Sequence, residues 1–202
     1  MPITLKELTA RLEEIGYSVM VPDGQDTECG LRFATESYVN PEGEHSVLVI
    51  CKISEDGSYL ELFTPNAYDS RNCKFKAALF ASMLQVAYMT KHLQLEHDPS
   101  DGEVRFAVDI PVCDGSVTTR QLYSMVRCLT CIVEEYHPVF THAMETGKID
   151  LSRVWKPKEP TQTPEAAAKP PMPPEMAALL EKFGLEGVEK LLAEQRASQG
   201  SA

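Results

Sequence analysis

The sequence predicts a small α+β domain in which helices flank an antiparallel sheet, followed by a proline-rich linker and a C-terminal amphipathic helix. Three observations predict this class: segments with apolar residues at helical spacing, short β-prone runs bounded by turn residues, and a change of composition after about residue 150. The predicted order of elements in the domain is α-β-β-β-β-α-β-β-α.

The first half of the domain reads as one helix and a strand meander. The helix is predicted over residues 4–15, because Thr4 and Glu7 form a capping box and Gly16 is suited to its end. Four β-prone runs follow, at residues 17–21, 31–35, 45–53 and 58–63. In the third run Leu48 and Ile50 fall opposite another set of apolar side chains, so we expect something to pack on each face of the sheet.

The second helix is predicted over residues 72–93, and its middle, residues 77–89, is apolar around most of its circumference. Such a helix either passes through the centre of the domain or gives one face to a second subunit. Phe80, Leu84 and Tyr88 are therefore candidate interaction residues, together with Leu48 and Ile50.

A hairpin and a third helix complete the domain. Residues 93–97 and 104–112 alternate as strands around a turn at residues 99–102. Thr118 with Gln121 forms the capping box of the third helix, which Pro138 is expected to kink or end.

Composition divides the chain into residues 1–150, a folded domain; 151–174, a proline-rich flexible linker; and 175–197, an amphipathic helical segment. Seven of the 14 prolines lie within residues 157–174, which favours extended, solvated chain. The last segment, with Leu179, Phe183 and Leu191 among its apolar residues, is too short to be a stable helix by itself and should need a surface to dock on.

Charge and cysteine usage exclude several classes of protein. Residues 1–155 carry 13 Lys and Arg against 23 Asp and Glu, a balance that repels nucleic acid and anionic lipid. No apolar run is long enough to span a bilayer, and the N-terminal residues do not form an export signal. We therefore expect a cytoplasmic protein whose six cysteines are reduced thiols.

Each motif that could carry chemistry favours a structural interpretation. Cys128 and Cys131 form a C-x-x-C inside the third helix, away from the helix N-terminus that would stabilise a thiolate. A zinc site using this pair with His137 and His142 has too short a spacer, and Pro99-Ser100-Asp101-Gly102 is a hairpin turn rather than a calcium loop. We expect no cofactor, no metal and no catalytic residue.

The second half of the domain carries a resemblance to known families. An acidic hairpin from Leu95 to Phe106 leads through Asp109-Ile110-Pro111-Val112 into the long helix ending Glu135-Tyr136-His137-Pro138. This pattern, with the order of elements, resembles the YbjN-like bacterial proteins and the type III secretion chaperones. The resemblance implies a peptide-binding, non-enzymatic, commonly dimeric module. This chain departs from the families in its proline-rich tail and in having four strands before the second helix.

The leading functional hypothesis is a chaperone-like or regulatory module that binds a polypeptide, such as a secreted effector-like protein, through an apolar groove or a sheet edge. The alternative is a homodimeric adaptor whose C-terminal helix docks in cis or in trans, or recruits another protein. An enzyme or a thiol redox sensor is a third hypothesis. The sequence does not distinguish among the partners or the pathways.

Overall fold

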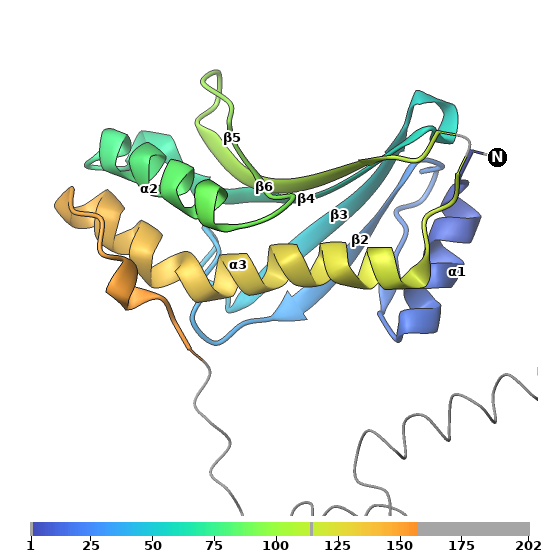
Figure 1. Ribbon diagram of the computed structural model, residues 1–202, viewed down its shortest axis with the longest axis horizontal. Helices are drawn as coiled ribbons and strands as arrows, with labels where there is room; N and C mark the ends of the chain where they lie inside the picture. The colour runs from blue at the N-terminus through green and yellow to red at the C-terminus, as the bar shows by residue number, and fades with distance from the viewer. Residues whose placement is uncertain (1, 114, 157–202) are drawn as a thin grey trace, which may run out of the picture. The chain divides into compact units, whose positions relative to one another are not determined.

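The computed structural model describes residues 2–113 and 115–156, which form a six-stranded antiparallel sheet with three α-helices (Figure 1). The fold class and the order of elements predicted from the sequence are confirmed. The helices are α1 Leu5–Ile15, α2 Lys76–Met89 and α3 Thr119–Thr146. The strands are β1 Val19–Met20, β2 Glu28–Ala34, β3 Ser46–Ser54, β4 Tyr59–Asp69, β5 Gln94–His97 and β6 Glu103–Pro111, in the spatial order β1-β2-β3-β4-β6-β5.

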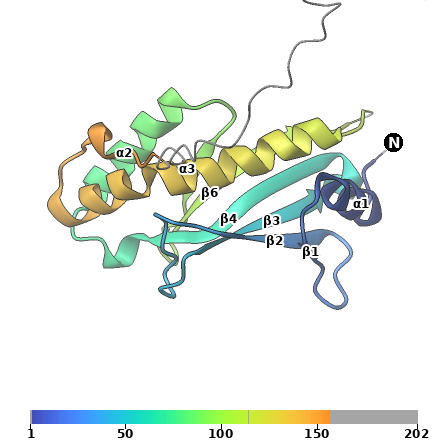
Figure 2. The ribbon, with the colours of Figure 1, turned by 90° about the horizontal axis from the view of Figure 1, so that it is seen from below.

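Helices cover one face of the sheet. α3 packs against β3, β4 and β6, and α1 packs against α3, β1 and β2. α2 contacts α3 and the edge strand β5, so α1 and α2 lie at opposite ends of the sheet (Figures 1 and 2). One continuous apolar core lies between this face and the helices, with Leu8, Leu62, Phe106 and Phe140 fully buried in it.

The opposite face of the sheet carries no helix of the described chain, which corrects the expectation that something packs on both faces. In β3, Val47, Val49, Cys51 and Ile53 are buried beneath the helices, whereas Leu48 and Ile50 are only half-buried. The alternation of side chains along the strand was predicted correctly. The sequence pattern could not show that the second face is open.

Strand boundaries differ most in β4, which extends to Asp69, six residues beyond the predicted end at Phe63. A shift of register against β6 between Thr64 and Tyr68, with Asn66 at a φ of 47°, lets the strand resume after Pro65. A bulge of this kind accommodates a proline that would otherwise break the ladder. β1 is shorter than predicted and β2 begins three residues earlier.

The two later helices also differ from expectation. α2 begins at Lys76 rather than Asn72, because Ser70–Asn72 forms a separate 3-10 turn. α3 runs through Pro138 and ends only at Thr146, where Gly147 adopts a φ of 74°. The helix beyond the proline is held by the buried side chains of Val139, Phe140 and Ala143, whose packing offsets the lost backbone hydrogen bond.

The first compact unit of the chain is Met1–Lys156. After α3 the chain turns back, and the half-buried Ile149, Leu151 and Val154 pack against the core. The predicted linker beyond residue 156 and the amphipathic segment with Leu179, Phe183 and Leu191 lie outside the described residues. No helix in the described part of the chain is long and apolar enough to cross a membrane.

Candidate interaction surfaces

The outer face of α2 is the most exposed apolar surface of the described domain. Leu84 is 74% exposed and Tyr88 is 92% exposed, one turn apart on the same side of the helix, and Met89 is 55% exposed beside them. The opposite side of α2 buries Leu79, Ser82, Met83 and Val86. The helix therefore does not pass through the centre of this domain, and its uncharged outer face is left without a partner from the described chain.

Of the interaction residues predicted from the sequence, only Leu84 and Tyr88 are exposed on this face. Phe80 is half-buried, and its ring lies against the imidazole of His97 with centroids 4.7 Å apart. Leu48 and Ile50 lie on the open face of the sheet, a separate surface. The predicted interaction residues therefore divide between two surfaces of the domain.

On the open face of the sheet, an apolar row crosses neighbouring strands at one level. The register pairs Met20 with Gly30, Gly30 with Ile50, Ile50 with Phe63, and Phe63 with Ala107. The side chains close over Gly30: a Cβ there would lie 3.5 Å from a terminal carbon of both Leu48 and Met20. The side chains of this row pack against one another, so they leave less apolar surface open to a partner than the outer face of α2 does.

A charged network borders that row. The guanidinium of Arg105 lies over the ring of Phe63, 4.9 Å from its centroid, and pairs with Glu61 at 3.2 Å and with Glu96. Partial burial raises the pKa of Glu61, and the nearby Arg105 opposes that rise. The two carboxylates satisfy Arg105 within the domain, so this arginine is not available to a ligand.

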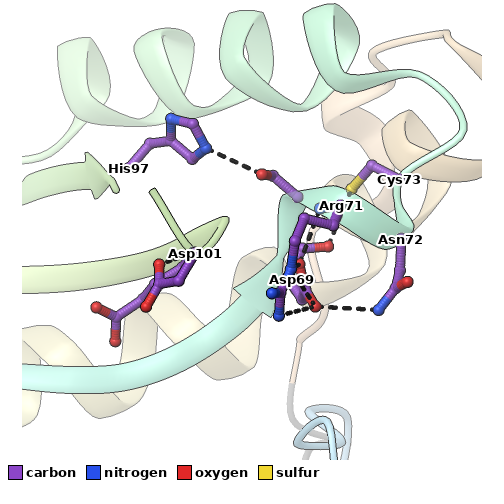
Figure 3. Close-up of polar contacts among 8 residues, drawn as sticks. Asp69, Arg71, Asn72, Cys73, His97 and Asp101 are labelled. Atoms are coloured by element: carbon purple, nitrogen blue, oxygen red, sulfur yellow. Dashed lines mark hydrogen bonds and ion pairs between the residues drawn. The ribbon is translucent and has the colours of Figure 1, made fainter. Parts of the chain in front are cut away.

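A polar cluster before α2 fixes where that helix starts (Figure 3). The Asp69 carboxylate accepts hydrogen bonds from the backbone N–H of Arg71 at 2.8 Å and from the side chain of Asn72 at 3.1 Å, and it pairs with the Arg71 guanidinium at 3.0 Å. The hairpin turn packs on this cluster, because the Ser70 N–H donates to the carbonyl of Gly102 at 2.8 Å. β5 is thereby tied to the beginning of α2.

Ser70 and His97 in this cluster have the spacing of a nucleophile and its base, with Oγ and Nε2 2.9 Å apart. However, Ser70 is only 1% exposed, so a substrate carbonyl has no approach to its hydroxyl. We interpret the contact as structural: it joins β5 to the turn that precedes α2.

A second half-buried imidazole belongs to α3 itself. His137 Nδ1 is 2.9 Å from the hydroxyl of Tyr68, and the two rings are stacked with Tyr38 edge-on to them. Burial raises the pKa of Tyr68 well above its ordinary value and lowers that of His137. A phenol that keeps its proton donates to a neutral imidazole, so this pair is satisfied without charge.

The loop before the β2–β3 turn is held by one carboxylate of α3. Glu134 accepts hydrogen bonds from three consecutive backbone N–H groups, those of Glu36 and Ser37 at 2.7 Å and that of Tyr38 at 2.8 Å. Because Tyr38 also contacts His137, these three hydrogen bonds join the loop to the buried aromatic cluster. Neither residue type nor spacing in the sequence indicated this contact.

The six thiols lie in environments that range from buried to exposed. All six cysteines are free, and Cys29 and Cys51 are buried cross-strand partners. Burial raises the pKa of Cys128, with a smaller contribution from Cys131, which opposes thiolate formation. Within the described residues, no group of three or more His, Cys, Asp or Glu side chains is placed to hold a metal ion.

A groove lies where β6 continues past β5. β5 pairs with β6 only up to Ala107, so Val108–Pro111 has no strand on that side, and a groove with a volume of about 550 Å³ opens between it and α3. Lys91 and His92, from the loop after α2, and Arg120 also line it. Sequence reasoning missed this groove, although the unequal lengths of the two hairpin strands were a signal for it.

The domain is similar in structure to a known bacterial protein. No family model and no curated protein matches the chain. Among solved structures, the chain is similar to YbjN from E. coli, whose description proposes that it is a transcription regulator. The match has 14% sequence identity and a TM-score of 0.43, and it covers 66% of this chain and 90% of YbjN. The YbjN-like proteins are one of the two families that the sequence of this chain resembles.

Proposed function

We propose that this protein is a non-enzymatic module that binds a polypeptide, and that the outer face of α2 is its docking surface. The observation that carries the proposal is the exposure of Leu84 and Tyr88 on a helix side without charged residues. Burying a large apolar side chain contributes about 1.5–3 kcal/mol, so a partner that covers both residues gains a useful part of its affinity here. Exposed apolar patches of this kind on a folded domain mark interaction sites.

The partner that fits this face is an amphipathic segment. Lys74 and Lys76 precede the uncharged stretch of α2 and Lys91 follows it, so the apolar stripe is bounded by cations at both ends. A partner helix with an apolar stripe and carboxylates beyond its ends matches that pattern.

The test uses peptides selected from a display library against the full-length chain. Leu84→Glu and Tyr88→Glu should each weaken the selected peptides by at least about tenfold, because a carboxylate would have to be desolvated in the interface. Tyr123→Glu is the matched control: it makes the same change as Tyr88→Glu at an exposed tyrosine of another helix, α3. Equal affinity for the Tyr88 and Tyr123 variants, or no selected peptide for a folded chain, would contradict the proposal.

A second copy of the chain is the alternative occupant of the same face, since an isologous dimer also covers an apolar helix. Light scattering after size-exclusion chromatography separates the two. A chain that is dimeric as the natural sequence and monomeric as Leu84→Glu would assign the α2 face to the dimer. In that case the C-terminal segment with Leu179, Phe183 and Leu191 is the candidate for recruiting another protein, and Phe183→Glu in the full chain tests it.

A further inference from the structure

The groove at the end of β6 contains polar groups that the domain leaves without partners. Among the arginines of residues 2–113 and 115–156, Arg11, Arg32, Arg71, Arg105, Arg127 and Arg153 each have a carboxylate, carbonyl or aromatic partner. Arg120 is the exception in this part of the chain, and it lines the groove. An unpaired guanidinium is unexpected in a domain with such an excess of carboxylates.

The carboxylate on the groove wall does not neutralise these cations. Asp109 Oδ2 accepts a hydrogen bond from Gln94 at 2.9 Å and lies 3.4 Å from the hydroxyl of Tyr59, while its Oδ1 is buried without a hydrogen-bond partner. Lys91 also lines the groove and has no ion pair within the described chain. Arg120 and Lys91 are exposed, so both cations are open to a ligand, and the buried Oδ1 of Asp109 lacks a partner beside them.

The remaining lining is suited to an apolar group. Val108, Ile110 and Pro111 form one wall, and Met125 lies on the α3 side. The sulfur of Cys128 lies 3.8 Å from the Lys91 carbonyl, which ties the loop after α2 to α3 across the groove. The volume of about 550 Å³ lies within the usual range of small-molecule sites.

We propose that this groove binds a carboxylate that carries an apolar body, with Arg120 on the carboxylate and the β6 wall on the apolar part. The guanidinium matches a planar carboxylate with two parallel hydrogen bonds. A dianion is disfavoured because the domain has ten more acidic than basic residues over positions 1–155. A free small acid and the C-terminus of a peptide both supply such a carboxylate, and both have the same recognition chemistry. This site is separate from the α2 face, so either proposal can fail alone.

The experiment titrates the 15N-labelled full-length chain with 4-phenylbutyrate and, as a neutral analogue, with 4-phenylbutanamide. We expect shifts in the backbone N–H signals of residues 91–92, 108–110 and 120–128, with the amide binding several-fold more weakly. Arg120→Gln should weaken 4-phenylbutyrate by about tenfold, the effect of one charge-assisted contact. Arg127→Gln is the matched control, because it removes the same charge from the same helix outside the groove lining.

A parallel titration with N-acetyl-Leu-Phe, free or amidated at its C-terminus, distinguishes the two sources of the carboxylate. Tighter binding of the free peptide than of 4-phenylbutyrate assigns the site to a chain terminus, and the reverse assigns it to a small acid. No binding of any of these probes at millimolar concentration, equal affinity for acid and amide, or an unchanged affinity in Arg120→Gln would overturn the proposal. Shifts confined to residues 84–89 would overturn it too, because they would place the probe on α2.

Discussion

Replacing Glu134 by alanine should destabilise the domain more than any other single exposed or half-buried carboxylate change on α3. The three backbone N–H groups that Glu134 holds differ in exposure: that of Glu36 is exposed, and those of Ser37 and Tyr38 are partly buried. A hydrogen bond to a charged group contributes about 1.5–3 kcal/mol, and water can replace the exposed one at little cost. Two partly buried bonds, discounted for the water that still reaches them, lead to an expected loss of about 2–4 kcal/mol.

Urea unfolding of the full-length chain, followed by circular dichroism, measures this loss as a shift of the midpoint at constant slope. Glu135→Ala is the matched control, because the Glu135 carboxylate does not hold these backbone N–H groups. Its backbone carbonyl, which accepts a hydrogen bond from the Trp155 N–H, is unchanged by the substitution. Glu134→Gln should fall between the two, since the amide oxygen can still accept while its NH2 group faces an N–H. If the free energies of unfolding of Glu134→Ala and Glu135→Ala differ by less than about 0.5 kcal/mol, the reasoning is refuted, because surface substitutions typically have effects of that size.

Three further outcomes follow from buried groups. Burial lowers the pKa of His137 in the folded chain, whereas histidines of the unfolded chain titrate near pH 6.5. The unfolded state therefore binds more protons, and the free energy of unfolding should fall as the pH is lowered from about 7 to about 5. His137→Gln should flatten that fall in urea unfolding. Gly102→Ala should cost about 1–3 kcal/mol, because φ is 83° and an added Cβ would lie 2.7 Å from a side-chain carbon of the turn beneath it; a midpoint equal to that of the natural chain would contradict this. Cys29 and Cys51 should react with a thiol reagent only after unfolding, whereas the exposed Cys113 should react at once; rapid labelling of the pair would show that the β2–β3 region opens easily.

Local sequence signals were sufficient for the elements themselves. Capping boxes at Thr4 and Thr118 mark the starts of α1 and α3, and both are present in the structure. Period-two alternation correctly divided the side chains of β3 between two faces, and the turn at residues 99–102 joins β5 to β6 as predicted. These features depend on neighbours within a few positions, which is why one sequence reveals them.

Local sequence did not predict that α3 continues through Pro138 or that β4 continues past Pro65, because both depend on tertiary packing. In both places distant residues stabilise a backbone that the local sequence disfavours: the core around Phe140 holds the end of α3, and pairing of Tyr68 with Val104 resumes the β4 ladder. Tertiary burial outweighs a local penalty of about 3 kcal/mol when several large side chains are involved.

The sequence by itself determined the α+β class, the order of the elements and the apolar character of α2. Only the tertiary structure decided which side of α2 is exposed, that Leu48 and Ile50 lie on a different surface from Leu84, and that Arg120 and Lys91 line the same groove. The physical reason is that periodicity reports how a side chain points from its own element, whereas exposure and charge pairing depend on what other elements place beside it.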